Sequence, residues 1–308
     1  MNKHIVTTTI NFPTVATNKF AQIATRDNWT FIIVGDLKTP HEEYEKLVNK
    51  YYPNVIYLNP ETQENLYKQL SDALGWKTIE RRNIGFLYAY KNGADIIATV
   101  DDDNIPYEDW GKDLYVNQEI DVDIWESQNG YFDPLSPTNN KDLWHRGYPI
   151  EHVFSKNNII YKGKSKRKVL VQADLWDGDP DIDAICRLSK KPIVKFDNIK
   201  PYGSLQYSPF NSQNTFISRE VIPHYMMLPF IGRMDDIWIS YIINKLFPNS
   251  IIYNRASVYQ DRNVQDLIKN LENEIIGYRH TLNLIEEKFS LPEKTLECYN
   301  LYKNYFNK

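Results

Sequence analysis

The fold is decided by the stretch Ala94-Asp95-Ile96-Ile97-Ala98-Thr99-Val100-Asp101-Asp102-Asp103-Asn104. Its apolar run from Ile96 to Val100 is rich in β-favouring residues and is typical of a buried strand in a parallel sheet. The run ends in three consecutive aspartates. Carboxylates this close together raise each other's pKa unless a cation or a ligand neutralises them. The stretch therefore predicts an interior strand that ends at a charged site.

The aspartate triplet by itself has two interpretations. Ligands of open α/β sheets bind at the carboxyl ends of the strands, and hard oxygen ligands suit Mg²⁺ or Mn²⁺. A solvated acidic loop that only caps the strand is equally compatible with the triplet. The surrounding elements and the other motifs have to decide between the two.

The composition is that of an ordinary globular protein. Its 308 residues, 42% of them hydrophobic and 25% charged, can bury the core of one large domain or two small ones. The 36 basic and 40 acidic residues give a net charge of −4, which implies no global attraction to nucleic acids or anionic membranes. Any partner must be recognised locally.

The cysteine content and the absence of long apolar runs bear on location. The two cysteines, Cys186 and Cys298, fit neither a disulfide framework nor a zinc site, which indicates a reducing compartment. No run approaches the roughly 20 apolar residues of a membrane span, and the start at Met1 lacks a signal-peptide core. We expect a cytoplasmic protein.

Strands and helices alternate over residues 1–105. Strands are predicted at His4–Ile10, Thr30–Val34 and Asn54–Leu58. A loop is expected after the first strand, and helices are expected at about 39–52, 60–76 and 78–92. This βαβ order predicts a Rossmann-like nucleotide-binding half that contains the central strand.

Several polar residues of this half lie where a nucleotide would be held. Asp36 ends the second strand and could accept a hydrogen bond from a base imide, although ordinary turn chemistry explains a Gly-Asp pair equally well. Thr8, at the end of the first strand, would seat the base and ribose. Arg81 and Arg82 begin the helix that leads into the central strand and could reach a diphosphate, with solvated surface as the alternative.

Residues 106–263 lose the regular alternation and predict an antiparallel, loop-rich acceptor half. The basic stretch 161–168 is predicted to be a solvated turn, with contact to an anionic acceptor as the alternative. In the segment Arg146-Gly147-Tyr148-Pro149 a turn would hold the arginine at a fixed angle, although an ordinary loop arginine fits as well. The acidic run Asp174–Ala184 contains Pro180 and lacks a closing glutamate, which argues against an EF-hand.

The end of the chain predicts one strand and three helices. Asp235 and Asp236 open an amphipathic helix. Acids in the first turn stabilise a helix by a few tenths of a kcal/mol through its dipole. Alternatively, one of the two aspartates is a general base directed into a cleft. A last strand is expected at Ser250–Tyr259. Residues 264–308 are expected to form two helices that pack on the body, with docking to a partner or a membrane surface as the alternative.

Four motifs occur in a fixed order and together resemble a known family. They are Asp101-Asp102-Asp103-Asn104; Arg146-Gly147-Tyr148-Pro149; Asp177-Gly178-Asp179-Pro180-Asp181-Ile182-Asp183-Ala184 with Arg187-Leu188; and Phe210-Asn211-Ser212-Gln213-Asn214 with Gly232-Arg233-Met234-Asp235-Asp236-Ile237-Trp238. The series resembles the STELLO family of glycosyltransferases. It is more distantly similar to the reversibly glycosylated polypeptides, which act as UDP-arabinopyranose mutases. The resemblance covers roughly residues 95–263.

The resemblance implies a GT-A fold, in which an α/β nucleotide-sugar-binding half with an Asp-x-Asp metal site joins an acceptor half. It implies a metal-dependent hexosyl- or pentosyltransferase that uses a nucleotide sugar, with a UDP-sugar as the favoured donor. The plant STELLO proteins are anchored in the Golgi membrane. This sequence shows no such anchor, so their location is not carried over.

The resemblance also suggests roles for individual residues. Asp103, with Asp101 assisting, would hold Mn²⁺ or Mg²⁺ against the donor diphosphate. The remaining donor contacts are expected from Thr8, Asp36, Arg81, Arg82, Asp102 and Arg262. Asp236, with Asp235 as the alternative, would act as the general base of an inverting displacement. Arg146 occupies the place of an arginine that is linked to self-glycosylation in the mutases.

Three functions remain open at this point. The favoured one is transfer of the sugar to a separate hydroxyl acceptor, either a glycan or, given the basic stretch 161–168, a nucleic acid. The second is a UDP-sugar mutase, and the third is a non-catalytic nucleotide-sugar-binding protein. The transferase is favoured because the longer matches lie on the STELLO side, whereas the mutase-like features are confined to Arg146 and its turn.

Overall fold

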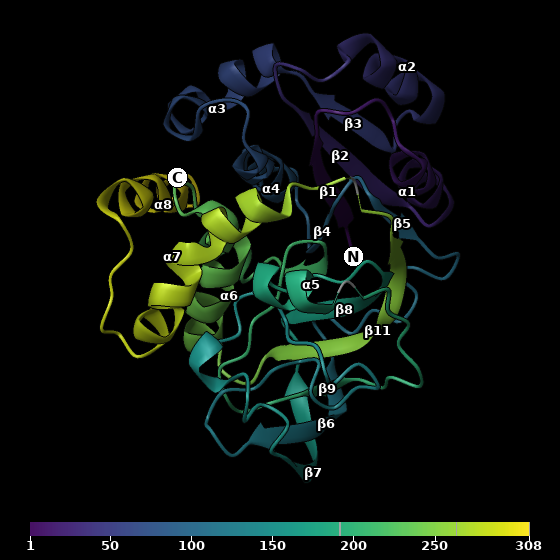
Figure 1. Cartoon of the computed structure of the whole chain (residues 1–308). Helices are drawn as coiled ribbons and strands as arrows, with labels where there is room; N and C mark the ends of the chain where they lie inside the picture. The colour runs from purple at the N-terminus through teal and green to yellow at the C-terminus, as the bar shows by residue number, and fades with distance from the viewer. Residues whose placement is uncertain (191, 263, 308) are drawn as a thin grey trace.

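The computed structural model describes residues 1–190, 192–262 and 264–307. Its described strands form one sheet of 11 strands, in the order β3-β2-β1-β4-β10-β8-β11-β9-β6-β7, with β5 paired to β11. Figure 1 shows the N-terminal strands at one end of the molecule and β6 and β7 at the other. The α/β fold class predicted from the sequence is confirmed.

The N-terminal half is a parallel sheet flanked by helices. Its strands are β1 (Lys3–Thr9), β2 (Trp29–Gly35), β3 (Val55–Leu58) and β4 (Ile96–Val100). Its helices are α1 (Val15–Arg26), α2 (His41–Tyr51), α3 (Pro60–Leu74) and α4 (Arg82–Lys91), with a 3₁₀ turn at Ile79–Arg81 before α4. The four strands pair in parallel, as the alternation of strand and helix predicts, and the structure places them in the order β3-β2-β1-β4.

The helix α1 lies where the sequence was expected to form only a loop, so that prediction was wrong. Thr14 caps the helix, because its hydroxyl accepts a hydrogen bond from the Thr17 amide at 3.0 Å. Phe20 and Ala24 are buried among the residues that face the sheet. Their spacing of one helical turn was the signal that could have revealed the helix.

The second half continues the same sheet instead of building a separate one. Its strands are β5 (Asn104–Pro106), β6 (Glu119–Ser127), β7 (Ile159–Lys168), β8 (Val171–Gly178), β9 (Tyr202–Gly203), β10 (Asn214–Ser218) and β11 (Ile251–Gln260). The central strand β4 pairs antiparallel with β10, while β8 and β11 run parallel to each other. The second half is therefore mixed rather than wholly antiparallel.

The basic stretch 161–168 is part of strand β7 and not a solvated turn, so that prediction was wrong. It pairs antiparallel with the acidic strand β6, where Asp121 lies opposite Lys166 and Asp123 lies opposite Lys164. Opposite charges facing each other across two strands stabilise the pair and neutralise the run. The exposed lysines also lie on an edge strand, where they discourage pairing with other chains. This arrangement weakens the case for a nucleic acid acceptor.

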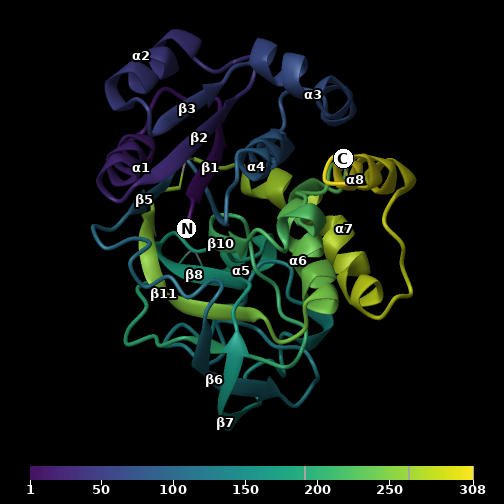
Figure 2. The same ribbon diagram turned by 180° about the vertical axis from the view of Figure 1, so that it is seen from behind.

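Four α-helices belong to the second half of the chain, as far as the structure describes it. They are α5 (Ala184–Lys190), α6 (Asp235–Leu246), α7 (Leu267–Ile285) and α8 (Glu293–Asn304). Figure 2 shows α6, α7 and α8 side by side. Tyr299 and Tyr302 of α8 are buried, and the Tyr302 hydroxyl donates to the Ile222 carbonyl at 3.2 Å.

Two further features of the C-terminal segment concern the sequence predictions. The boundary expected at residue 263 falls on Asn263, which lies outside the described residues. None of the helices in the described part of the chain combines the length and the apolar character needed to cross a bilayer.

Gly85 allows the helix α4 to lie directly on the strands that end at the site. A Cβ atom at this position would lie 2.5 Å from Cγ1 of Val6 and 2.8 Å from Cγ2 of Val34. Both valines are buried in the core. We therefore expect Gly85→Ala to lower the free energy of unfolding by about 1–3 kcal/mol through overpacking.

Urea denaturation monitored by circular dichroism measures this effect. Lys91→Ala, at an exposed position of the same helix, is the matched control and should change stability by less than about 0.5 kcal/mol. Equal stabilities of Gly85→Ala and the wild type would show that α4 is not held this closely on the sheet.

Candidate active site

Two adjoining cavities lie where β1, β4 and β11 end. The first has a volume of about 280 Å³, and its lining includes the whole aspartate triplet together with Asp235 and Asp236. Four arginines also line it: Arg82, Arg146, Arg233 and Arg262. The second has a volume of about 370 Å³ and is lined by residues that include Thr9, Asp36, Lys38 and Lys77. The two cavities share Thr8, Ile79 and Asp102 in their linings.

The three aspartates after β4 have different surroundings. Asp101 accepts a hydrogen bond from Nη2 of Arg82 at 2.6 Å, and burial raises the pKa of its carboxyl group although this arginine opposes the change. Asp102 accepts hydrogen bonds from the Thr9 hydroxyl and from Nδ2 of Asn11. Asp103 lines the first cavity beside them. The triplet therefore ends a buried strand at a cavity, as the sequence predicts.

The residues at the triplet fit a divalent cation that is shared with a ligand. Among the described residues no group of three or more His, Cys, Asp or Glu side chains is arranged to hold a metal. However, Gln213 and Gln260 line the same cavity as Asp103, and their buried Oε1 atoms have no hydrogen-bond partner in the part of the chain that the structure describes. Mg²⁺ and Mn²⁺ prefer oxygen ligands, and Mg²⁺ commonly takes one or two carboxylates together with substrate phosphates.

Arg81 is not brought to either cavity, so its expected contact with a diphosphate is not supported. Its side chain is fully buried against α3, where it donates to Oε1 of Gln63 at 2.8 Å and to the Gly75 carbonyl at 2.7 Å. The guanidinium also stacks on the ring of Trp76, 3.4 Å from its centroid. Burial lowers the pKa of Arg81 to about 10. Its neighbour Arg82 is the one that reaches the aspartates.

Asp36 lines the second cavity, and its carboxylate already accepts hydrogen bonds from backbone amides. Its carboxylate accepts hydrogen bonds from the backbone amides of Leu37 at 2.5 Å, Lys77 at 2.7 Å and Thr78 at 3.2 Å. These contacts hold the segment at residues 77–78 against the end of β2. Thr8 lines both cavities and donates its hydroxyl hydrogen to the Val34 carbonyl at 2.9 Å.

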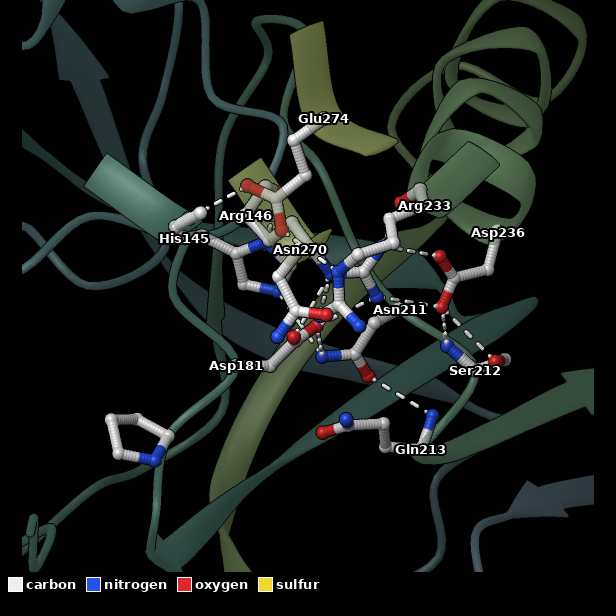
Figure 3. A network of polar contacts seen from close by, with 12 residues as sticks. His145, Arg146, Asp181, Asn211, Ser212, Gln213, Arg233, Asp236, Asn270 and Glu274 are labelled. Carbon is white, nitrogen blue, oxygen red and sulfur yellow. Dashed lines mark hydrogen bonds and ion pairs between the residues drawn. The ribbon is translucent and has the colours of Figure 1, made fainter. Parts of the chain in front are cut away.

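Arg146 is clamped between two buried carboxylates, which we call the Arg146 clamp. Its Nε donates to Oδ1 of Asp181 at 2.9 Å, and its Nη1 donates to Oδ1 of Asp236 at 2.9 Å. Its Nη2 donates to both aspartates, and Nη1 also donates to the carbonyl of Arg233. Figure 3 shows the guanidinium surrounded by these groups.

The charges of the Arg146 clamp stabilise one another. Burial favours the neutral carboxyl groups of Asp181 and Asp236, but the guanidinium outweighs burial and holds both pKa values below their usual range. The two carboxylates in turn overcome the burial of Arg146 and hold its pKa well above the usual value. All three groups are therefore charged at neutral pH.

Asp235 and Asp236 have opposite electrostatic environments although they are neighbours in α6. Asp236 also accepts hydrogen bonds from the Ser212 amide at 2.8 Å and the Ser212 hydroxyl at 3.0 Å, so both of its oxygens are occupied. The pKa of Asp235 is raised well above its usual value by burial, and then by the charges of Asp236 and Glu80. Both carboxyl groups line the first cavity.

Sequence reasoning missed several residues of the site. Arg262, which it did predict, lines the first cavity with its Nε 3.5 Å from Oδ1 of Asp179. Asp181 and Arg233 were quoted as parts of motifs without a role. Gln260 gave no signal beyond its place at the end of the last strand.

Comparisons with known proteins agree with the family resemblance. No family model matches the chain. The Arabidopsis thaliana proteins named probable glycosyltransferases STELLO1 and STELLO2 are 24% and 23% identical to it over 232 residues. Each match covers 69% of this chain, and the chain spans 29% of the length of these relatives. The similarity to STELLO proteins that the motifs predict is confirmed.

Solved structures show weaker likeness. Residues 1–349 of TarS from S. aureus match with a TM-score of 0.48 at 13% identity, over 99% of this chain and 71% of that chain. A structure titled mannosyltransferase PcManGT from Pyrobaculum calidifontis in complex with GDP-Man and Mn²⁺ matches with a TM-score of 0.46 at 10% identity, over 99% and 69% of the two chains. At such scores the likeness carries no argument about this site.

The Arg146 clamp predicts a large and pH-dependent loss of stability in Arg146→Met. The substitution removes the only cation paired with Asp236 among the described residues and leaves Asp181 only Arg262, 3.9 Å away, which should lower the free energy of unfolding by about 3–5 kcal/mol at pH 7. In the wild type the depressed pKa values add stability above the pKa of an ordinary aspartate, and that stability is lost as the pH falls. In the variant, burial raises the pKa values of Asp181 and Asp236, so both carboxylates take up protons as the pH falls. Protonation removes the buried charges, and the difference in unfolding free energy between wild type and variant becomes smaller toward pH 4.

Urea denaturation at pH 7 and at pH 4.5 measures both parts of this prediction. Arg255→Met is the matched control, because Arg255 pairs with Asp109 and Asp113 near the surface, where such pairs contribute about 0–1 kcal/mol. If Arg146→Met lowers the free energy of unfolding only slightly, or by the same amount at both pH values, the stabilising role of the Arg146 clamp is contradicted.

Proposed function

We propose that this chain is a metal-dependent glycosyltransferase that transfers a sugar from a nucleotide sugar, a UDP-sugar in the first instance, to a hydroxyl acceptor. The observation that carries the proposal is the first cavity, where the aspartates of an interior strand lie together with four arginines. Such a lining suits a diphosphate, because arginine donates to its oxygens while carboxylates hold a cation against it. The similarity to the STELLO proteins supports the same activity.

The two adjoining cavities divide the donor between them. The second, at the ends of β1 and β2, would seat the nucleoside, with Thr8 and Asp102 at the junction. The first would hold the diphosphate and the sugar. Arg82 and Arg262 supply positive charge beside the triplet, and the unpaired amides of Gln213 and Gln260 can accept from sugar hydroxyls.

The metal would be held by Asp103, with Asp101 beside it. When bound, Mn²⁺ or Mg²⁺ stabilises the negative charge that develops on the leaving nucleoside diphosphate. Arg82 orients Asp101 through their 2.6 Å contact, and Thr9 and Asn11 orient Asp102. The protein thus fixes the triplet before the donor arrives.

Asp235 is the better candidate for the general base of an inverting transfer, in place of Asp236. A general base works best when its pKa lies near the working pH, and the pKa of Asp235 is raised whereas that of Asp236 is lowered. Asp236 uses both of its oxygens on Arg146 and Ser212, which gives it a positioning role. Asp235 would take the proton from the acceptor hydroxyl as that oxygen attacks the sugar.

The Arg146 clamp favours a transferase over a self-glycosylating mutase. Every nitrogen of the Arg146 guanidinium donates to an oxygen of Asp181, Asp236 or the Arg233 carbonyl. A guanidinium whose pKa is held high has no lone pair to attack a sugar. We therefore assign Arg146 the task of fixing Asp236 and the start of α6 at the cavity.

A thermal-shift screen of UDP-, GDP-, CMP- and dTDP-sugars with and without Mn²⁺ tests donor and metal together. One class of donor should stabilise the wild type by about 2.7 kcal/mol at a hundredfold excess over Kd, and EDTA should remove most of this effect. Asp103→Asn should lose the Mn²⁺-dependent part, whereas the exposed control Asp142→Asn should keep it. If the donor still stabilises the protein in the presence of EDTA and in Asp103→Asn, the aspartate triplet has a structural role and does not bind a metal.

Substitution of the two neighbouring aspartates tests the assignment of the base. Asp235→Asn should lower kcat by about 10²- to 10⁴-fold with little change in donor affinity. Because the base must be deprotonated, kcat/KM of the wild type should rise with pH through the raised pKa of Asp235, above the range of an ordinary aspartate. Asp236→Asn should instead lower stability by loosening the clamp.

Initial rates of sugar transfer and of donor hydrolysis, measured from pH 4 to 9, give these quantities. A folded Asp236→Asn protein that has lost turnover, beside an active Asp235→Asn, would assign the base to Asp236. Donor binding without any turnover by the wild type, across a panel of hydroxyl acceptors, would favour a non-catalytic binding protein.

A further inference from the structure

A third cavity lies at the opposite end of β11 from the candidate active site. It has a volume of about 470 Å³, and its lining includes Lys166, Arg167 and Lys168 of β7 together with Asn249 and Ser250. Because β11 runs from Ile251 to Gln260, and a strand rises about 3.3 Å per residue, roughly 30 Å separate this cavity from the aspartate triplet. We call it the Arg167 cavity.

Only one of the three nitrogens of the Arg167 guanidinium, Nη1, donates hydrogen bonds to described residues. Arg167 is 5% exposed, and its Nη1 donates to the Ser204 carbonyl at 3.2 Å and the Asn249 carbonyl at 3.4 Å. Its Nε and Nη2 are buried and find no hydrogen-bond partner within residues 1–190, 192–262 and 264–307. Nε and Nη2 are the pair of parallel donors with which arginine grips the two oxygens of a carboxylate or a phosphate.

No acidic side chain of the described residues compensates the charge of Arg167. The buried Arg82 and Arg187 have such partners in Asp101 and Asp179, and the buried Arg81 donates instead to Gln63 and the Gly75 carbonyl. Glu220, which lines the cavity, is bound to Lys168 at 2.8 Å. Burial lowers the pKa of Arg167, and no neighbouring charge opposes this change. A buried charge without a partner is unfavourable, so an anionic ligand would stabilise the site.

We propose that the Arg167 cavity is a binding site for an oxyanion of the phosphate monoester class. Two oxygens of the anion accept from Nε and Nη2 of Arg167, while the contacts of Nη1 keep the guanidinium in this orientation. Lys166 and Lys168 also line the cavity, but they already pair with Glu119 and Glu220, so the charge available to the anion is that of Arg167. Because Nε and Nη2 are buried, side chains of the lining have to move as the anion enters.

This site is independent of the proposed sugar transfer. It shares no lining residue with the two cavities at the triplet. A phosphate monoester can be free in solution or carried on a lipid headgroup, and the chemistry at Arg167 is the same for both. The experiment therefore has one arm for each source.

The first arm titrates the full chain with inorganic phosphate at constant ionic strength, without nucleotide, and follows heat by calorimetry. Arg167→Met should weaken the Arg167-dependent binding by at least about tenfold, the loss expected for a charge-assisted bidentate contact. Arg167→Lys keeps the positive charge but loses the two parallel N–H donors, so its phosphate affinity should lie between those of Arg167→Met and the wild type. Lys164→Met, on the same strand but outside the cavity lining, is the matched control and should bind as the wild type does.

The second arm measures flotation with phosphatidylcholine vesicles with and without phosphatidic acid. Flotation that needs both phosphatidic acid and Arg167 assigns the lipid headgroup as the source, and phosphate binding without flotation assigns a soluble phosphate. Both results support the site.

Thermal unfolding in chloride buffer shows whether Arg167 is instead a structural residue. If the site binds an anion, Arg167→Met removes an uncompensated charge and should unfold at a temperature no lower than the wild type. Equal phosphate affinities of the wild type, Arg167→Met and Lys164→Met would overturn the proposal, as would the absence of saturable binding by the wild type. Neither result depends on donor binding or turnover, so the failure of this proposal and that of the proposed function can be told apart.

Discussion

The Arg146 clamp is the interaction on which the candidate active site depends. It joins a turn after β6, the segment after β8 and the start of α6, which are distant in sequence, through one guanidinium and two buried carboxylates. Ser212, just before β10, is tied to the same Asp236. Because each partner would be a costly buried charge by itself, the segments are stable only when they meet. The clamp therefore fixes the far wall of the cavity relative to the aspartates of β4.

Charge balance explains how such a site can exist before a ligand arrives. The cavity lining places five aspartates beside four arginines. Two of these pairings, Arg82 with Asp101 and Arg146 with Asp236, hold carboxylates in fixed positions. Burial, together with the charges of Asp236 and Glu80, raises the pKa of Asp235. Neighbouring carboxyl groups thus differ in charge environment: Asp236 is held by Arg146, whereas the pKa of Asp235 is raised.

The sequence predicted most of the regular elements but less of the site. The parallel order of the first four strands followed from the alternation of apolar strands and capped helices. The helix α1 was missed although its cap Thr14 and the spacing of Phe20 and Ala24 were readable. The stretch 161–168 was taken for a turn because its charges, without their partners on β6, favour solvent. The sequence could not distinguish the roles of Arg81 and Arg82, because consecutive residues at a helix start point in different directions around its axis, toward Gln63 and toward Asp101 here.

By itself, the sequence determined the α/β class, the placement of an acidic triplet at the end of an interior strand and the order of the family motifs, because apolar periodicity and motif order are local properties of the chain. Only the tertiary structure decided which charges meet. It paired Arg146 with Asp181 and Asp236, turned Arg81 away from the cavity, and left the fork of Arg167 without a carboxylate. The physical reason is that pairing energy depends on distance and burial, and both are set by contacts between segments that are far apart in sequence.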